Sequence, residues 1–151
     1  MRLVVQRVIS ASVRSGGATL GSIERGAVVL AGAAAGDTPE IVDRIATKLH
    51  GLRYFRDADG RTNVDIGEAG GAYLLVSQFT LLADVRRGRR PGFTLAGDPA
   101  VAETLIRRLA DRLAADGTRV ETGRFGAEME VELVNDGPFT LVLDSERDLG
   151  G

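Results

Sequence analysis

Three polar side chains interrupt an apolar run near the middle of the sequence. Residues 72–84 read Ala-Tyr-Leu-Leu-Val-Ser-Gln-Phe-Thr-Leu-Leu-Ala-Asp. The apolar part predicts a strand that is buried on both faces, and Ser77, Gln78 and Thr80 follow it directly. A buried polar group that is left unpaired costs about 1–3 kcal/mol. These side chains therefore either pair within the protein, as at an ordinary strand end, or face a cavity in which a ligand satisfies them.

A compact basic loop follows these polar residues. It holds four arginines within five positions, Arg86, Arg87, Arg89 and Arg90. The net charge of the whole chain is −2, so any contact with nucleic acid has to be local, and this loop is the only dense basic cluster. Polar groups beside four arginines indicate a pocket for a negatively charged partner, although such a run taken alone is more often a solvated loop.

The side chains most often used in catalysis are scarce. The chain has no cysteine and a single histidine, His50, which excludes thiol catalysis, disulfides and metal sites built from thiolates or several imidazoles. His50 stands at the end of a predicted helix, where interaction with the helix dipole is the simpler role. Ser77 or Thr80 could act as a nucleophile only with an activating base, and the sequence places none beside them.

Length and composition are those of one ordinary globular domain. With 151 residues, 44% of them hydrophobic and 26% charged, the chain can bury one substantial core. No apolar run approaches the ~20 residues of a membrane span, the N-terminus does not read as a signal peptide, and the lack of cysteine fits a cytoplasmic protein. We expect a domain over residues 1–145 and a polar, frayed tail over 146–151.

The hydrophobic patterns predict an α+β fold with a mainly antiparallel, barrel-like sheet and two flanking helices. Helix starts of the Thr-Pro or Asp-Pro type precede residues 39–51 and 99–115. In the second helix, a core-facing stripe is expected from Val101, Leu105, Leu109 and Leu113. Besides the buried strand that opens the 72–84 stretch, strands are expected at 2–9, 11–14, 18–23, 27–31, 52–55, 119–122, 127–134 and 139–143, and residues 63–66 are expected to lead toward the strand at 72.

A second distinctive motif, Asn135-Asp136-Gly137-Pro138, lies between the last two predicted strands. From the residues alone, Gly-Pro predicts an ordinary turn. The alternative is a cis peptide bond, which occurs at about 5–6% of X–Pro bonds in folded proteins.

The two motifs together resemble those of the D-aminoacyl-tRNA deacylase family. The first motif is Ser77-Gln78-Phe79-Thr80-Leu81 and the second is the segment from Asn135 to Pro138. Further matches extend up to Ser145: Gln6-Arg7-Val8, Gly36-Asp37-Thr38, Leu52-Arg53, Gly88-Arg89-Arg90-Pro91 and the segment from Glu121 to Ala127. The departures are small, with Leu82, Gly92 and Phe139 at positions where the family more often has tyrosine, serine or asparagine, and valine.

The resemblance implies a cytoplasmic homodimer that hydrolyses the ester between a D-amino acid, or glycine, and the 3′-terminal adenosine of tRNA, and that rejects L-aminoacyl-tRNA. It implies no metal, no other cofactor, and no membrane or DNA partner. It also implies that the bond between Gly137 and Pro138 is cis. This motif would enter the partner subunit's pocket as the chirality filter, braced by Arg7.

The same resemblance assigns roles to the other candidate residues. Ser77, Gln78, Phe79 and Thr80 would frame the scissile ester, with the backbone N–H of Phe79 as an oxyanion donor. The adenosine side would be lined by Ala102, Phe125 and Met129, and phosphates would meet Arg86, Arg87, Arg89 and Arg90. If the ribose 2′-OH assists the reaction, the protein needs only to position the ester and donate hydrogen bonds, which would explain the scarcity of catalytic side chains.

Two alternatives stay open at the level of sequence. The first is a non-catalytic dimer that binds the 3′ end of tRNA, with the basic loop as the binding element. The second is a hydrolase of another small ester that uses Thr80 as a covalent nucleophile.

Overall fold

β1 is the strand on which the sheet is built. The computed structural model describes residues 1–150, and β1 spans Arg2–Ser15. On one edge, its first half pairs antiparallel with β3 (Gly26–Gly32) and its second half with β2 (Ala18–Ile23). On the other edge it pairs with β8 (Glu130–Asp144) along nearly its whole length. Because two strands share one edge of β1, the sheet bends along this strand.

Two further strands add parallel pairs to the sheet. β6 (Ala72–Ser77) runs parallel to β3, and β7 (Val120–Thr122) runs parallel to β6. The strand order is β2-β1-β3-β6-β7, with β8 on β1. The antiparallel pairs of β1 make up most of the ladder, as expected, whereas the pairs of β6 are parallel and make the sheet mixed. The reason lies in the connections, because a helix between two strands returns the chain to the same end of the sheet.

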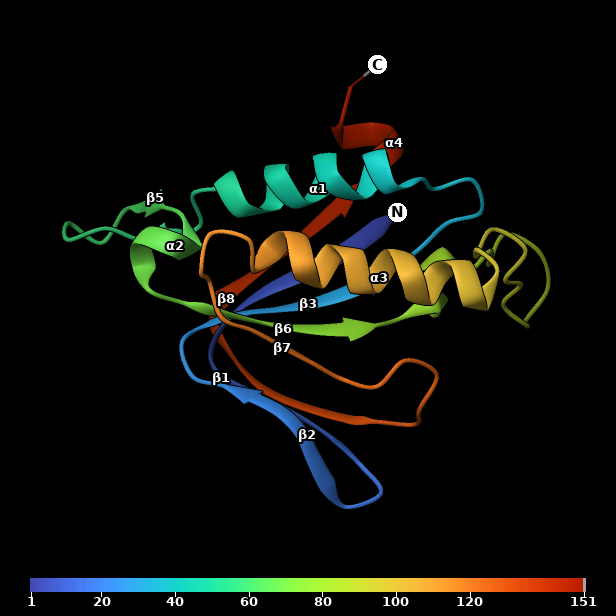
Figure 1. The fold of residues 1–151 in the computed structure, drawn as a ribbon, viewed down its shortest axis with the longest axis horizontal. Helices are drawn as coiled ribbons and strands as arrows, with labels where there is room; N and C mark the ends of the chain where they lie inside the picture. The colour runs from blue at the N-terminus through green and yellow to red at the C-terminus, as the bar shows by residue number, and fades with distance from the viewer. Residues whose placement is uncertain (151) are drawn as a thin grey trace.

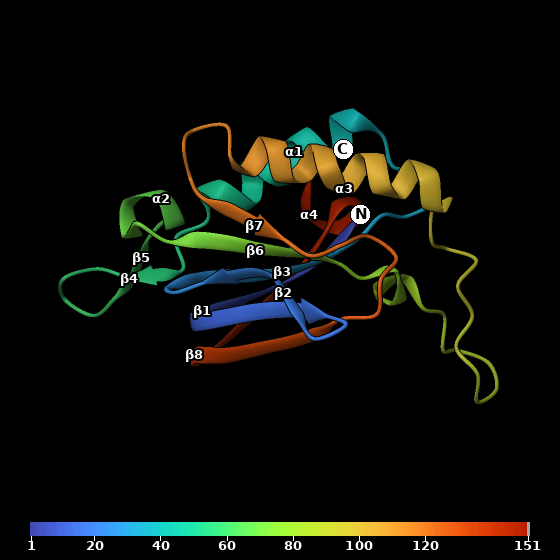
Figure 2. The same cartoon turned by 60° about the horizontal axis from the view of Figure 1, so that its bottom comes forward.

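β2 and β7 approach each other and nearly close the sheet into a barrel. The Arg119 guanidinium donates to the Ser22 carbonyl oxygen at 3.0 Å, and a Cβ at Gly21 would lie 3.1 Å from the carbonyl oxygen of Thr122. The curled sheet is visible in Figure 2, with the long helices above it. The predicted barrel-like α+β fold is confirmed.

Two long helices cover one face of the sheet (Figure 1). α1 spans Pro39–Gly51 and α3 spans Pro99–Leu113. Thr38 Oγ1 accepts the N–H of Ile41 at 3.4 Å, and the Asp98 carboxylate accepts two N–H groups of the first turn of α3 at 3.2 and 3.3 Å. The helix starts follow the predicted capping chemistry.

The predicted core stripe of α3 is wrong at its first position. Val101 is 53% exposed, and Ala102 is buried instead, on the same face as Leu105 and Leu109. Each residue of an α-helix is rotated by about 100° from the one before it. Val101 is 12 residues before Leu113 and therefore points about 120° away from it around the helix axis. Ala102 is 11 residues before Leu113 and points only about 20° away. Position 101 therefore rotates out of the stripe and position 102 rotates into it.

The core has two parts. Between the helices and the sheet, the larger cluster includes Leu3, Val5, Ile45, Leu49, Leu75, Leu105 and Leu109. Inside the curled sheet, the smaller cluster includes Val8, Val13, Ile23, Val28, Leu74 and Val76. Successive residues of β6 face opposite sides of the sheet, so Leu74 and Leu75 supply the two clusters in turn. This explains why the run from Ala72 to Val76 is apolar on both faces.

Several predicted segments have different boundaries in the structure. The short strand expected at 52–55 is β4 (Phe55–Arg56), which forms a hairpin with β5 (Thr62–Val64). A single-turn helix, α2 (Ile66–Ala69), follows where the segment 63–66 was expected to lead directly into the central strand. The strands expected at 127–134 and 139–143 are one continuous strand, β8.

The end of the chain is not frayed within the residues that the structure describes. Residues Ser145–Asp148 form a helical turn, α4. Arg147 donates to the Val142 carbonyl oxygen at 2.7 Å, and Arg44 donates to the Leu149 carbonyl oxygen at 2.6 Å. The expected frayed tail is therefore wrong up to residue 150, and Gly151 lies outside the described residues. No helix between residues 1 and 150 is long and apolar enough to cross a membrane.

Candidate active site

The polar residues that interrupt the apolar run lie at the carboxyl end of β6. Ser77 is the last residue of β6, and the N–H of Gln78 donates to the Ala31 carbonyl oxygen at 2.8 Å. The chain then forms a 3-10 helix, η1 (Phe79–Leu82). Thr80 therefore lies on η1 and not on the strand, and its Oγ1 accepts a hydrogen bond from Gln78 Nε2.

Ser77, Gln78 and Phe79 border a cavity of about 320 Å³, whereas Thr80 does not line it. The ends of β3 and β6, the first half of α3, Phe93 and Phe125 enclose it. Gly32 permits this arrangement, because a Cβ there would lie 2.8 Å from the Gln78 carbonyl oxygen. The volume falls in the range of about 300–1,000 Å³ typical of small-molecule sites. The cavity suits a small, partly apolar group held by a few polar contacts.

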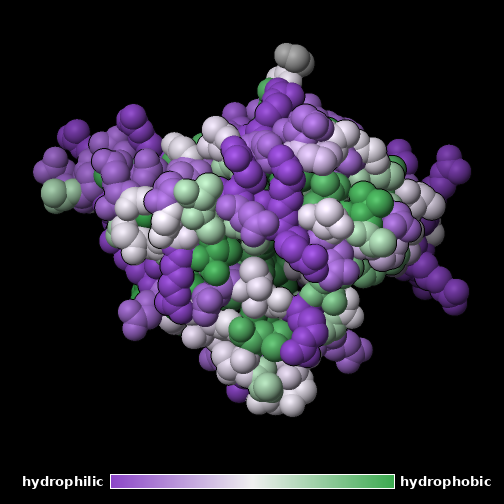
Figure 3. Space-filling model, viewed as in Figure 1, coloured by the Kyte–Doolittle hydropathy of each residue, from purple (hydrophilic) through white to green (hydrophobic). Residues whose placement is uncertain are grey.

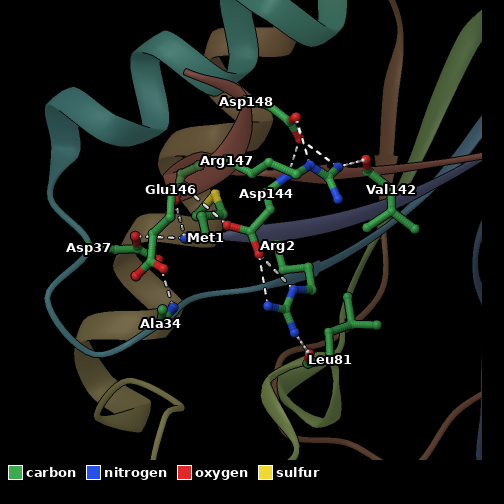
Figure 4. A network of polar contacts seen from close by, with 11 residues as sticks. Met1, Arg2, Ala34, Asp37, Leu81, Val142, Asp144, Glu146, Arg147 and Asp148 are labelled. Atoms are coloured by element: carbon green, nitrogen blue, oxygen red, sulfur yellow. Dashed lines mark hydrogen bonds and ion pairs between the residues drawn. The ribbon is translucent and has the colours of Figure 1, made fainter. Parts of the chain in front are cut away.

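η1 is held in place by Arg2, the first residue of β1. Arg2 Nη1 donates to the Leu81 carbonyl oxygen at 2.8 Å, and Arg2 Nε donates to the Asp144 carboxylate at 2.8 Å (Figure 4). At the start of η1, backbone N–H groups lack an intrahelical acceptor, and Phe79 occupies this position. Its ring is 56% exposed and meets the Phe93 ring edge to face, with centroids 5.1 Å apart. A backbone N–H at the first position of η1 and an exposed aromatic residue thus border the cavity.

The second motif projects from β8. Gly137 and Pro138 are exposed, and the peptide bond between them is cis, the form that the resemblance implies. The pairing of β8 with β1 shifts register between Gln6 and Val8, opposite this motif. The two residues therefore form a bulge that is directed away from the regular ladder of the sheet.

Arg7 of β1 holds this bulge in place. Its side chain is almost fully buried, and it donates to the Asp136 carbonyl oxygen at 3.0 Å and to the Tyr54 carbonyl oxygen at 2.6 Å. The guanidinium carbon lies 4.7 Å from the centre of the Phe139 ring. Burial, followed by repulsion from nearby Arg56, lowers the pKa of Arg7 from its usual value, but arginine stays charged in proteins. The structure brings Arg7 to the motif that it was expected to brace.

The two motifs do not meet within one chain. Gly137 and Pro138 lie opposite Arg7 on β1, whereas the cavity lies where Ala31 of β3 pairs with Leu3. Four residues along a strand correspond to about 13 Å. In addition, β8 and β6 are separated by β1 and β3. Neither Gly137 nor Pro138 lines the cavity at Ser77.

Comparison with known proteins identifies the family. The family model described as D-Tyr-tRNA(Tyr) deacylase matches residues 4–144. The chain belongs to this family. A D-aminoacyl-tRNA deacylase of Symbiobacterium thermophilum is 56% identical over 97% of both chains, and one of Anaeromyxobacter dehalogenans is 52% identical over 97% of this chain and 99% of its own.

Two solved structures share this fold. The c-Myc DNA Unwinding Element Binding Protein superposes with a TM-score of 0.89 at 36% identity, covering 95% of this chain and 98% of that chain. A probable eukaryotic D-amino acid tRNA deacylase superposes with a TM-score of 0.83 at 16% identity, covering 94% and 97%. At that identity, the second match supports the fold alone.

The residues that the family resemblance places around adenosine are only partly brought together. Ala102 and Phe125 line the cavity, but Met129 does not. Its Sδ accepts the backbone N–H of Arg124 at 3.4 Å. In this structure Met129 therefore supports the 123–125 segment from behind.

The four arginines of the basic loop are not equivalent. Two hydrogen bonds between Asp84 and Gly92, at 2.7 and 2.9 Å, close the base of the loop, which projects from the body of the protein (Figure 2). Arg86 is paired with Asp84 at 2.7 Å, and this contact lowers the pKa of the Asp84 carboxyl to about 2. Arg86 is therefore already neutralised locally. Arg87, Arg89 and Arg90 are the exposed cations of the loop that remain available for phosphates.

His50 lies away from the cavity, at the end of α1. Its Nε2 is 2.6 Å from an Asp116 carboxylate oxygen, and its Nδ1 is 3.3 Å from the Tyr73 hydroxyl. It has no contact with Ser77 or Thr80, in agreement with the structural role expected from the sequence. No cluster of three or more acidic or histidine side chains that could hold a metal ion occurs between residues 1 and 150.

Arg56 is a site residue that the sequence reasoning missed. Its Nη1 lies 3.0 Å from both carboxylate oxygens of Asp136, so the carboxylate is held between Arg56 and Arg7. The only sequence signal was a basic residue beside a predicted turn, which is common on any protein surface. The contact between Arg56 of β4 and Asp136 of β8 joins residues 80 positions apart, so it depends on the tertiary fold.

Asn135 closes the Gly-Pro bulge with three hydrogen bonds. Its Nδ2 donates to the carbonyl oxygens of Arg7 and Phe139 at 3.0 and 2.9 Å, and its Oδ1 accepts the N–H of Phe139 at 2.9 Å. We predict that Asn135→Ala lowers the free energy of unfolding by about 2 kcal/mol, because half-buried backbone groups lose their partners. Denaturant unfolding measures this change, and hydrogen exchange at the Phe139 amide should accelerate.

The matched control is Asn63→Ala, which removes one exposed bond to Asp57 at 3.2 Å. It should change the stability by less than about 0.5 kcal/mol. Equal effects of the two substitutions would contradict the bracing role of Asn135.

Proposed function

We propose that this protein hydrolyses the ester of D-aminoacyl-tRNA, and of glycyl-tRNA, as a homodimer that rejects L-aminoacyl-tRNA. The observation that carries the proposal is the division of the site. One chain has a cavity with polar groups at its rim and, more than about 10 Å away, an exposed and braced Gly137–Pro138 bulge. Within one chain, the bulge does not line the cavity. A second copy of the chain supplies the missing half to each cavity.

The chemistry proposed for the cavity is the addition of water to the ester carbonyl carbon. The developing oxyanion accepts the N–H of Phe79, and collapse of the tetrahedral intermediate breaks the bond between the carbonyl carbon and the ribose oxygen. The ribose oxygen takes up a proton, and the products are a free D-amino acid and tRNA with a free terminal hydroxyl. The 2′-OH of the substrate ribose is the group that assists this proton transfer, and the protein positions the ester.

Selectivity follows from the backbone groups of the bulge. Carbonyl groups of Gly137 and Pro138, presented to the partner's cavity, leave room for a hydrogen at the position where an L-amino acid carries its side chain. A D-amino acid places its side chain elsewhere, and glycine has none to exclude. Arg7, Asn135 and Arg56 keep the bulge in place, because an error of about 1 Å in a positioning group can change a rate by about 10².

Binding of the tRNA is assigned to the exposed side chains of Arg87, Arg89 and Arg90. They lie on the loop that ends just before Phe93, which lines the cavity, and contacts to phosphates position nucleic acid without reading its sequence. A substrate of this kind is found in the cytoplasm, which is where we expect the protein to act.

Thr80 is a poor candidate for a covalent nucleophile. Its hydroxyl oxygen accepts a hydrogen bond from the Gln78 amide, and an amide N–H cannot remove the proton of a hydroxyl. His50 lies elsewhere, bound to Asp116. The alternative of a non-catalytic protein that binds the tRNA end is tested directly by an activity assay.

The deciding experiment compares matched D- and L-tyrosyl-tRNA. We expect the D-ester to be hydrolysed at least about 10²-fold faster in kcat/KM, with release of tyrosine followed over time. Binding of both substrates without release of amino acid would instead favour the non-catalytic alternative. Equal hydrolysis of both would remove the chirality filter from the proposal.

A mixing experiment tests whether the bulge acts on the partner's cavity. Pro138→Ala frees the backbone at position 138 and should allow hydrolysis of the L-ester, whereas Ala102→Phe fills the cavity and should be inactive. An excess of the Ala102→Phe protein should suppress L-ester hydrolysis by the Pro138→Ala protein after subunit exchange, because intact bulges then reach the open cavities. The control is the same excess of a protein that carries both Pro138→Ala and Ala102→Phe, which should not suppress L-ester hydrolysis because its bulge is also altered. If the control protein and the Ala102→Phe protein had the same effect on L-ester hydrolysis, each bulge would act on the cavity of its own chain.

Thr80→Ala separates positioning from covalent catalysis. Loss of one positioning or oxyanion-type group costs about 10²–10³ in kcat, whereas loss of an essential nucleophile costs about 10⁶. We expect measurable activity in this variant and no acyl-enzyme by mass spectrometry. A substrate that ends in 2′-deoxyadenosine should bind but be nearly inert, and normal hydrolysis of that substrate would refute the role of the 2′-OH.

A further inference from the structure

A second hollow adjoins the cavity at Gln78. Its volume is about 300 Å³, and it shares Ser77, Ile106 and Phe125 with that cavity. The two hollows therefore meet along the inner side of α3. Figure 3 shows this face of the protein, on which hydrophilic side chains form a ridge over α3 and apolar surface is exposed beside it.

The walls of the second hollow combine an apolar floor with positive charge. Leu75, Ile106 and Ala110 are apolar lining residues, and Phe125 borders both hollows. Two cationic residues, Arg107 and Arg124, and one acidic residue, Glu103, also line it, so the charged side chains of the wall carry a net positive charge. Apolar and aromatic surfaces bind the faces of unstacked bases, and guanidinium groups bind phosphate.

The two arginines differ in how they are paired. Arg107 lies 3.3 Å from the Glu103 carboxylate, within one turn of α3. The Arg124 backbone N–H is bound to Met129, but its guanidinium makes no hydrogen bond or ion pair with any group in residues 1–150. Arg124 is therefore the cation of this hollow that an anionic ligand can engage without displacing a partner.

We propose that the second hollow binds the nucleotide that precedes the terminal adenosine of tRNA, with Arg124 contacting the phosphate between the two nucleotides. This inference rests on the proposed function, because it takes the terminal adenosine and its ester to occupy the cavity at Gln78. The next nucleotide is joined to that adenosine by one phosphodiester, so its base lies either in an adjoining hollow or in solvent. The second hollow adjoins the first directly, and it carries both surfaces that a nucleotide requires.

The basic loop does not replace Arg124 in this role. None of its four arginines lines either hollow, although Phe93, which follows the loop, lines the first. The loop is thus placed for phosphates elsewhere on the tRNA. Arg124 lies two residues after the end of β7, and its backbone N–H is bound to Met129 beside the hollow.

The test uses two stable analogues in which an amide replaces the ester, so that binding is measured whether or not hydrolysis occurs. One is the D-tyrosyl amide of 3′-amino-3′-deoxyadenosine, and the other is the same compound extended by one cytidine through a 5′ phosphodiester. We expect the unsubstituted protein to bind the extended analogue about tenfold more tightly, as measured by calorimetry, for one charge-assisted contact plus base stacking. The Kd ratio of the two analogues should fall toward one in Arg124→Ala and be partly restored in Arg124→Lys.

Arg61→Ala provides the matched control, because Arg61 is an exposed arginine outside both hollows. It should leave the Kd ratio unchanged. If Arg124 has a purely structural role, Arg124→Ala weakens the binding of both analogues equally and leaves the Kd ratio unchanged, which would overturn the proposal. The proposal would also be overturned if the unsubstituted protein bound the two analogues equally tightly. Failure of the proposed function is seen separately, as a lack of D-ester hydrolysis in the tRNA assay.

Discussion

The buried guanidinium of Arg7 is the interaction on which the functional architecture depends. It joins the Tyr54 carbonyl oxygen, the Asp136 carbonyl oxygen and the Phe139 ring around one cation. A charge removed from water is costly unless hydrogen bonds replace its hydration, and here backbone oxygens from two separate segments provide them. The same contacts that stabilise the charge therefore fix the loop before β4 against the bulge of β8. Arg56 adds a second, more exposed contact to Asp136 from the same side.

The parallel pairs of the sheet place the cavity. Because α1 and α3 connect β3, β6 and β7, the carboxyl ends of β3 and β6 lie side by side, at Ala31 and Ser77. Ligands commonly bind outside the carboxyl ends of parallel strands, and η1 and the start of α3 complete the enclosure here. The antiparallel half of the sheet instead carries the bulge. One chain thus presents a receptor on its parallel side and a projecting element on its antiparallel side, an arrangement suited to association of two copies.

Several arginines are bound to backbone carbonyl or carboxylate groups of the protein itself. Arg2 holds η1, Arg7 holds the bulge, and Arg86 is bound to Asp84 within its own loop. Among the arginines of the basic loop and of the second hollow, those without an acidic partner in residues 1–150 are Arg87, Arg89, Arg90 and Arg124. This pattern explains how a chain with a net charge of −2 can have local surfaces that suit a polyanion. For the proposed binding of tRNA, the local position of the cations matters more than the net charge of the chain.

Local patterns in the sequence determined the strands, the two long helices with their Thr38 and Asp98 caps, and the two motifs, because these features depend on neighbouring residues alone. The resemblance to a family supplied the roles of Arg7 and of the Gly137–Pro138 motif. Tertiary structure decided the rest. The two strands predicted at 127–134 and 139–143 are one strand, β8, and Arg56 contacts Asp136. Met129 binds the Arg124 backbone and does not line the cavity, and Arg124 lines the second hollow. The Met129 contact spans only five residues, but the other contacts join segments that are far apart in the sequence, so they arise only when those segments pack together.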